Sequence, residues 1–422
     1  MFAAPKAEKL EPGQIEIAFA CEGDGPLDVG GPLMFEGIII PAFEKMTGVK
    51  VNIIRVGSPN DTTERLDAMI RADLIPNVYW DYGGRAGLYT QPGIGLPLND
   101  YLGQETIDKY YPSYIDMFST DGILYGLPCT SWATVGWVDT ELLEQAGAMD
   151  VLDDGIFTYE ELEDVTRALR KDGGEYYATG LFAAETGGDY YLYTFWLAGH
   201  GAKLYNIDGS IALNSPEGIE ALELLKRWYD DGLLPYGAAG LKDIDYAAQL
   251  LYEGNTVAAS YAAAVPAIEF DPLFMSTVHK LDVEFAPVAS GIQVVVAFDT
   301  GTEEQKKAAA ELVKYIASAE NQQMRVDRGR FPSMFGVDLS NMHPKIKIAA
   351  ENMAVNGVFD MGLGKPHYVA MRFLWQTMLQ AILTNDTDEW AKDLGKKTDG
   401  SIAGALAVFE ERGNELIAEM AR

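Results

Sequence analysis

The hydrophobic positions in the first part of the chain alternate between the spacing of strands and the spacing of helices. Residues 15–20 run apolar like a strand, residues 35–46 have helical spacing, and residues 49–56 return to strand periodicity. An amphipathic helix over 61–72 and a short apolar strand at 77–80 repeat this order. Because strands that alternate with helices pair in parallel through right-handed crossovers, the pattern predicts an α/β fold.

The rest of the chain carries start signals for further elements. Thr158 precedes a helical pattern over 158–170, and Glu161 stands at its capping-box position. Ser215 and Pro216 begin another helix that is expected to reach residue 230. Further expected elements are a strand at 132–138, a helix at 140–146, a hairpin at 206–213, a strand at 292–298, a helix at 302–319 and mostly helix from residue 341 onward.

Length and charge narrow the class of protein. A chain of 422 residues is long enough for more than one core, and 48% apolar residues is an ordinary globular composition. The formal net charge of −31 repels phosphate backbones and anionic lipids, so we expect no nucleic-acid partner. A solvated acidic surface is the simpler explanation of this charge, and a binding site for cationic ligands is the alternative explanation. No run approaches the roughly 18 apolar residues of a membrane span.

Residues that carry catalysis or bind metals are not arranged in any known motif. The four histidines are scattered, no nucleophile elbow or phosphate loop is present, and no metal or other cofactor is expected. Cys21 and Cys129 are either small buried side chains or one disulfide. Among 63 acidic residues, carboxylate pairs such as Glu22 with Asp24 occur by chance, so a glycoside hydrolase remains only an alternative. We expect a protein that is not an enzyme.

Aromatic residues stand where an open α/β sheet binds its ligands. Trp80 and Trp132 fall near predicted strand ends, and Trp196 follows a run of tyrosines. A flat ring offers a stacking surface to a sugar, while carboxylates and arginines bind its hydroxyls. Polar and glycine residues at 81–85 favour a loop after Trp80, whereas Trp228 within a capped helix is expected to be core.

Short motifs then follow one another in an order that resembles a known family. They are FEKMTGVKV at 43–51, PNVYW at 76–80, a glycine- and proline-containing run at 88–101, YGLP at 125–128, WVD at 137–139, NSPE at 214–217 with WYDDGL at 228–233, a run at 252–261 and GRFPS at 329–333. Together they resemble the extracellular solute-binding proteins of ABC importers, in particular family 1, the carbohydrate-binding family that includes maltose-binding protein.

This resemblance implies a two-lobed, type II periplasmic-binding-protein-like fold with hinge strands between the lobes. Lobe 1 would comprise 1–128 and 265–326, and lobe 2 would comprise 129–264 and 327–422 with a helix-rich C-terminus. A sugar or oligosaccharide would be captured between the closing lobes and delivered to the transmembrane subunits of an ABC permease. The protein is expected to be a monomer, at the extracellular face of the cytoplasmic membrane or in the periplasm. It would be free or a lipoprotein, with its leader absent from this sequence.

The resemblance also implies a set of ligand-binding residues. Trp80 matches a sugar-stacking tryptophan and Arg85 lies near a hydroxyl-binding arginine, while Tyr261 takes the place of a cleft tryptophan. Asn77 replaces the usual aspartate, which leaves the particular sugar open, and a cationic or peptide ligand stays an alternative. The full expected set is Trp80, Asp81, Tyr82, Arg85, Glu22, Asp24, Trp132, Tyr191, Tyr193, Trp196, Tyr261, Arg330 and Trp375.

Overall fold

The computed structural model describes residues 13–21, 33–56, 62–153, 157–185, 189, 192–248, 253–262, 273–275, 278–279, 290–342, 347, 350–351, 353–354 and 357–420. By their contacts these residues divide into two units. Unit 1 holds the described residues up to Thr130 with Ile292–Arg328 and Pro332–Asp338, and unit 2 holds those within Ser131–Gly291, Gly329–Phe331 and from Leu339 onward. The chain therefore passes between the units several times. In the described part, no helix has the length and apolar character needed to cross a membrane.

Parallel strands form the centre of the unit 1 sheet, as the alternation of strands and helices predicts. Strand β1 (Glu16–Cys21) lies between β2 (Lys50–Arg55) and β3 (Val78–Tyr82) and pairs in parallel with both. Strand β11 (Ser290–Ala297) adds to β3 in the antiparallel direction. In this register Cys21 is opposite Trp80, so the carboxyl ends of β1 and β3 bring these two residues together.

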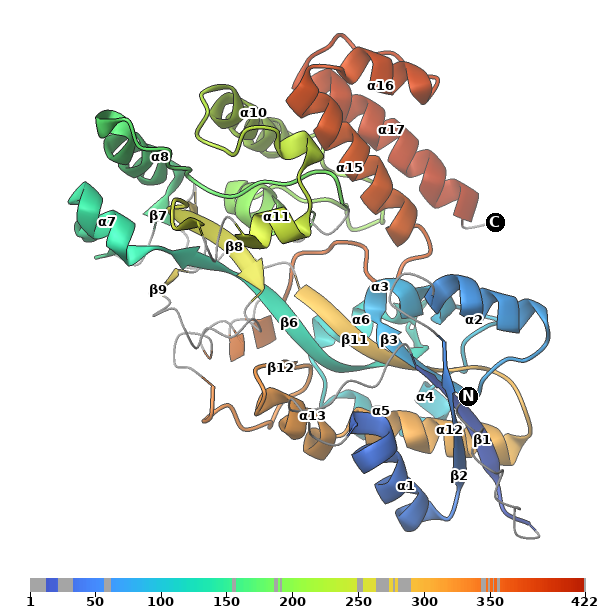
Figure 1. Cartoon of the computed structure of the whole chain (residues 1–422). Helices are drawn as coiled ribbons and strands as arrows, with labels where there is room; N and C mark the ends of the chain where they lie inside the picture. The colour runs from blue at the N-terminus through green and yellow to red at the C-terminus, as the bar shows by residue number, and fades with distance from the viewer. Residues whose placement is uncertain are drawn as a thin grey trace, which may run out of the picture. The chain divides into compact units, whose positions relative to one another are not determined.

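Helices cover both faces of this sheet. Helix α1 (Ile40–Thr47) connects β1 to β2, and α2 (Thr62–Arg71) connects β2 to β3. Because β2 and β3 flank β1 on opposite sides and such crossovers are right-handed, the two helices fall on opposite faces. Helix α12 (Glu303–Ile316) packs on β1 and β3, on the side away from α2 (Figure 1).

Short elements complete unit 1. They are η1 (Met34–Ile39), α3 (Gly83–Ala86), η2 (Gly87–Tyr89), α4 (Asn99–Leu102), α5 (Gln104–Ile107), α6 (Pro112–Met117), β4 (Ser119–Thr120), β5 (Ile123–Leu124) and α13 (Ala319–Val326). Strand β6 (Gly126–Val138) starts in unit 1 and ends in unit 2, and the short β12 (Phe331–Pro332) lies next to it in the strand order.

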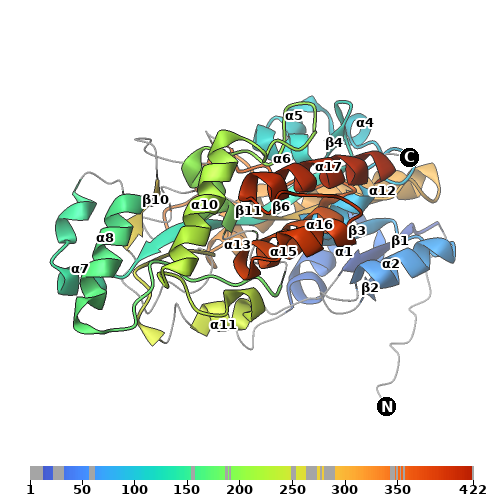
Figure 2. The ribbon, with the colours of Figure 1, turned by 90° about the horizontal axis from the view of Figure 1, so that it is seen from above.

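Unit 2 is built mainly from helices. Its long helices are α7 (Thr140–Ala146), α8 (Tyr159–Leu169), α10 (Pro216–Asp230), α15 (Tyr368–Thr384), α16 (Thr387–Asp393) and α17 (Ile402–Met420). Helices α10, α15 and α17 pack against one another, and they lie side by side in both views (Figure 1 and Figure 2). The shorter elements are η3 (Met149–Leu152), η4 (Arg170–Asp172), η5 (Tyr193–Leu197), η6 (Ala198–His200), η7 (Ala238–Gly240), α11 (Asp243–Ala248), β7 (Phe157–Thr158), β8 (Ala258–Ala262), β9 (Leu273–Met275) and β10 (Val278–His279).

The expected lobe boundaries differ from the units of the structure. The first change of unit falls after Thr130 rather than after residue 128. The return to unit 1 occurs at Ile292 rather than at residue 265, because β9 pairs with β6, and β10 pairs with β7, both within unit 2. Residues 327–328 and 332–338 also belong to unit 1, not to the second lobe.

Two expected helices are also corrected. The helix predicted over 302–319 is divided, because α12 ends at Ile316 and the Ser318 hydroxyl caps α13 by accepting a hydrogen bond from the Asn321 amide. The C-terminal region contains a non-helical stretch over 357–367, in which Gly357, Gly362 and Gly364 adopt positive φ.

Cys21 and Cys129 are both buried thiols that are not joined in a disulfide.

Candidate functional site

The run from Trp80 to Arg85 turns sharply at the end of β3. Strand β3 ends at Tyr82 and helix α3 begins directly at Gly83. A Cβ atom at Gly83 would lie 2.9 Å from both Ile292 Cγ2 and Phe118 Cζ, so the turn needs glycine at this position. The short helix places Arg85 one turn after Asp81, on the same side of the chain.

Asp81 and Arg85 form an ion pair in unit 1. Asp81 is fully buried, and its Oδ2 accepts a hydrogen bond from Arg85 Nε at 2.8 Å. The Tyr79 hydroxyl also donates to Asp81, and burial together with this carboxylate raises the pKa of Tyr79. The Arg85 guanidinium lies over the Tyr82 ring, 5.5 Å from its centroid. Asp81 therefore orients Arg85, and the partly exposed Tyr82 and Arg85 are the members of this group that reach solvent.

Trp80 is held among apolar and cationic neighbours in the same unit. Its ring packs edge-on against Phe35 at 4.9 Å, and the Arg325 guanidinium carbon lies over it at 5.8 Å from the centroid. Only 7% of Trp80 is exposed, so little of the ring is open for stacking. Trp80 Nε1 finds no hydrogen-bond acceptor among the described residues.

In unit 2, Trp132 contacts two residues that, like itself, lie next to positions where the chain passes from one unit to the other. Gly291, at the start of β11, lies against the indole, and a Cβ there would come within 1.8 Å of Trp132 Cζ2. Arg330 lies over the same ring, with its guanidinium carbon 5.7 Å from the centroid. Trp132 and Arg330 are both partly exposed. The structure thus brings together two residues that the sequence placed in the site.

The other predicted aromatic residues of unit 2 lie inside its core. Tyr193 and Trp375 are in contact at 5.1 Å between ring centroids, and they are 1% and 2% exposed. Trp196 is 1% exposed and packs between Tyr159 and Trp228. It also borders a cavity of about 10 Å³, the size of one water molecule. In this conformation none of Tyr193, Trp196 and Trp375 presents a ring face to a ligand, which differs from the expectation that they bind one.

The remaining predicted site residues are not placed by the structure. Glu22, Asp24 and Tyr191 lie outside the described residues. For Tyr261 only the backbone is described, in β8 opposite Val135 of β6. Within the described part, no group of three acidic, histidine or cysteine residues is placed to hold a metal ion.

Arg325 is a polar residue of this region that the sequence reasoning missed. It lies on α13, is 4% exposed, and shares its buried side with Asn321 and Gln322. A signal was present, because these polar residues recur at helical spacing. An arginine on the buried face of a helix needs a partner.

Comparison with known proteins relates this arrangement to a family. Residues 39–354 match the family described as bacterial extracellular solute-binding protein. A binding protein of Brucella abortus is 31% identical over 150 residues, which is 35% of this chain and 35% of that protein. An arabinooligosaccharide-binding protein of Halalkalibacterium halodurans is 26% identical over 131 residues, which is 31% of this chain and 27% of that protein. The chain thus spans about a third of the length of these curated relatives.

Solved structures show the same fold over nearly the whole chain. The cyclic α-maltosyl-1,6-maltose binding protein from Arthrobacter globiformis has a TM-score of 0.73 at 15% identity, covering 96% of this chain and 100% of that one. An ABC transporter solute-binding protein from Thermotoga lettingae, bound with α-D-tagatose, has a TM-score of 0.71 at 18% identity, with the same coverage. These likenesses confirm the predicted α/β periplasmic-binding-protein fold. The chain belongs to the family of bacterial extracellular solute-binding proteins.

Proposed function

We propose that this chain is the substrate-binding receptor of an ABC importer. It captures a sugar or oligosaccharide by closing its two units on it, and delivers it to the transmembrane subunits of a permease. It acts as a monomer outside the cytoplasmic membrane, either free or lipid-anchored. Closure of this kind is a population shift, so the solute must favour the closed state by its contacts.

The observation that carries this proposal is the family match over residues 39–354. Sugars recur in the names of similar proteins: the Thermotoga lettingae structure contains tagatose, and a Staphylococcus aureus solute-binding protein with a TM-score of 0.68 was solved with maltose. The Halalkalibacterium halodurans relative is named for arabinooligosaccharides. These names support a carbohydrate as the class of solute.

The partly exposed groups of each unit have the chemistry that sugars need. Tyr82 and Arg85 in unit 1, and Trp132 and Arg330 in unit 2, pair a ring with a guanidinium. A ring contributes roughly 0.5–1.5 kcal/mol when it stacks, and the arginines donate to hydroxyls. Several such contacts give the roughly 8 kcal/mol of micromolar binding.

Calorimetric titration tests this function. Neutral mono- and oligosaccharides are expected to bind to the wild-type protein, and Trp132→Ala is expected to weaken that binding at least tenfold. The matched control is Tyr236→Ala, because Tyr236 is 94% exposed and lies outside the candidate site. Absence of binding by every carbohydrate to folded protein would contradict the proposal.

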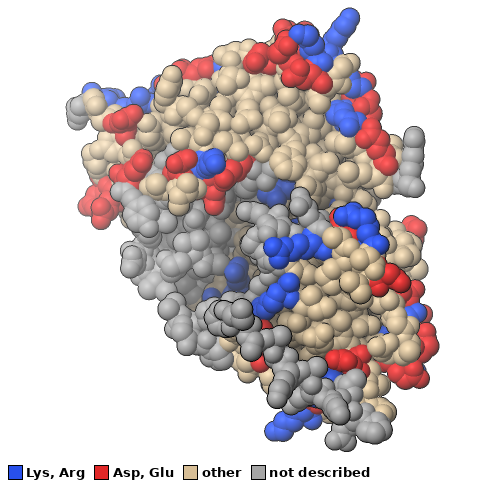
Figure 3. Space-filling view, turned by 45° about the vertical axis from the view of Figure 1, so that its right-hand side comes forward, with Lys and Arg blue, Asp and Glu red and all other residues tan. Residues whose placement is uncertain are grey.

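A cationic or peptide ligand is the competing outcome of the same titration. Polyamines or cationic peptides would then bind with a steep dependence on salt, because charge pairing is screened. On the face drawn in Figure 3, blue Lys and Arg lie beside red Asp and Glu at several places, so the negative charge in view is mixed with positive charge. On this face, therefore, the acidic residues do not form a surface of one sign for a cationic ligand.

A further inference from the structure

Arg325 and Trp80 present unused hydrogen-bond donors to the same part of unit 1. Both terminal nitrogens of Arg325, Nη1 and Nη2, lack a partner among the described residues, and so does Trp80 Nε1. The guanidinium lies over the indole ring, so these donors are close together. Both side chains are more than nine-tenths buried.

The surroundings show that this is not an ordinary buried arginine. Arg325 Nε donates to the thioether of Met34 at 3.1 Å, a weak acceptor, and no described carboxylate pairs with the guanidinium. The neighbouring polar side chains of the same helix are satisfied: Asn321 donates to the Tyr315 carbonyl, and Gln322 bridges Ala317 and Ser333. The Cys129 sulfur is close to both Arg325 and Trp80, but a buried thiol is a weak acceptor and does not supply the anion that the two terminal guanidinium nitrogens need.

The Phe35 and Trp80 rings lie 6.0 and 5.8 Å from the Arg325 guanidinium carbon and offset part of the cost of burying its charge. They leave both terminal nitrogens without a strong acceptor, which a ligand anion can supply. We propose that Arg325 and Trp80 together bind a carboxylate group of the solute, so that the captured carbohydrate contains a uronic acid. This inference rests on the proposed function and names its substrate class. Two parallel guanidinium N–H groups match the two oxygens of a carboxylate, and the indole N–H adds a third bond.

A carboxylate fits this group better than a phosphate does. The donors carry one positive charge in total, which balances one carboxylate, whereas a phosphate monoester carries about −1.5 to −2. The charge of Arg325 is local, so it attracts one acidic group even though the whole chain is strongly acidic.

Matched acidic and neutral sugars test the inference by calorimetry. Galacturonate and digalacturonate are titrated against galactose and galactobiose, with galactose 1-phosphate as a separate arm, at about 0.1 M salt. The wild type is expected to bind the uronides at least tenfold more tightly than their neutral twins. Arg325→Met is expected to abolish this preference, while Arg325→Lys retains part of it. The control is Arg328→Met, which removes an exposed arginine three residues further along the chain.

The melting temperature of the unliganded protein provides a second readout. If Arg325 had a purely structural role, its replacement would lower this temperature rather than raise it. Without ligand, Arg325→Met is expected to melt a few degrees higher than the wild type, because a buried charge with no carboxylate partner is removed. Uronides should then raise its melting temperature no more than neutral sugars do. A lower melting temperature of the unliganded variant, with the preference intact, would overturn the inference.

The remaining outcomes separate this inference from the proposed function. Neutral sugars that bind the wild type as tightly as uronides overturn the carboxylate site and leave the receptor function standing. Tighter binding of galactose 1-phosphate also overturns the carboxylate class. If non-sugar carboxylates such as citrate bind but no carbohydrate does, the proposed sugar-receptor function is wrong. Binding of a carboxylate by Arg325 and Trp80 would still stand.

Discussion

At the scale of single residues, the absence of a side chain at Gly291 determines where the Trp132 ring lies. A methyl group at this position would overlap the indole, because its carbon would lie within 1.9 Å of the Cζ2 and Cε2 atoms of the ring. Arg330 packs over the same ring, so a displacement of the indole would also disturb this contact. Glycine here is a packing requirement.

We therefore expect Gly291→Ala to weaken solute binding at least tenfold and to lower the melting temperature by several degrees. Both effects follow from displacement of the indole, and they are measured by calorimetry and thermal denaturation. Gly240→Ala is the control, because a Cβ at Gly240 meets no atom within 4 Å. Equal losses in both variants would mean that the close approach at Gly291 is not the cause.

The types of the residues predicted which chemistry the candidate site offers, but they did not predict which aromatic side chains are buried in the core. Trp132 and Arg330 were both predicted, and the structure places them in contact. Trp196 and Trp375 were predicted on the same grounds but are core residues, because tertiary packing decides which side of a ring meets solvent. Arg325 escaped prediction since its neighbours, Met34 and Trp80, are far from it in sequence.

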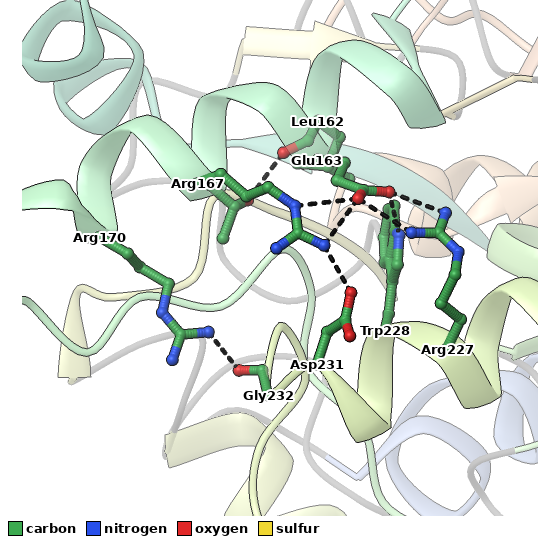
Figure 4. Close-up of polar contacts among 9 residues, drawn as sticks. Leu162, Glu163, Arg167, Arg170, Arg227, Trp228, Asp231 and Gly232 are labelled. Carbon is green, nitrogen blue, oxygen red and sulfur yellow. Dashed lines mark hydrogen bonds and ion pairs between the residues drawn. The ribbon is translucent and has the colours of Figure 1, made fainter.

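At the scale of elements, helices α8 and α10 are joined by a network of charges around Glu163 (Figure 4). Arg227 and Arg167 donate to its carboxylate at 2.8–2.9 Å, and Trp228 Nε1 donates at 2.7 Å. Burial alone raises the pKa of Glu163, but these hydrogen bonds outweigh it and lower the pKa to about 2. The ionised carboxylate therefore stabilises the contact between the two helices.

Glu163→Gln is expected to lower the free energy of unfolding by about 2 kcal/mol at pH 7. Each pKa unit corresponds to about 1.4 kcal/mol, and we reduce the sum because both arginines are about half exposed. Since the folded pKa is depressed, this stability is present above about pH 4.5 and is lost as the pH falls toward 2.

Denaturant titrations of wild type and variant at pH 7 and pH 3 check this expectation. The difference between the two proteins should shrink at the lower pH. Glu160→Gln is the control, because Glu160 is an exposed residue in the first turn of the same helix. A variant as stable as the wild type at pH 7 would show that the network contributes nothing net.

Elements with local start signals were predicted well. Helix α8 has the expected capping box at Thr158 and Glu161, and α10 begins at Pro216 after the Ser215 cap. The break between α12 and α13 was missed, because a serine followed by good helix formers is also compatible with a continuous helix. Strands β9 and β10 were missed since their partners, β6 and β7, are more than a hundred residues away.

At the scale of the whole molecule, unit 2 depends on the C-terminal end of the chain. Helices α15 and α17 pack on α10, and the side chain of Asn414 on α17 accepts a hydrogen bond from the Ile211 amide at 3.0 Å. Trp375 of α15 contacts both Tyr193 and Phe409. Sequence periodicity predicted these helices but could not assign them to a core.

A chain that ends at Asp338 is therefore expected to lose the folded structure of unit 2. Removal of α15 and α17 exposes the buried face of α10, including Leu222 and Leu225. Hydrogen exchange at α10 should become fast, or the product should aggregate. A chain that ends at Met420 retains α17 and serves as the control. Persistent protection of α10 in the shorter chain would contradict the expectation.

The burial of both thiols has a practical consequence for chemical labelling of the protein. Cys21 and Cys129 are the two cysteines of the chain and are 0% exposed, and burial raises the pKa of Cys129 to about 11. At neutral pH the Cys129 thiol therefore stays protonated, and its burial keeps reagents away from it. A cysteine placed at the fully exposed Ile207 would then be the preferred attachment point for a maleimide fluorophore. The chain can thus be labelled at one introduced cysteine without prior removal of its own two.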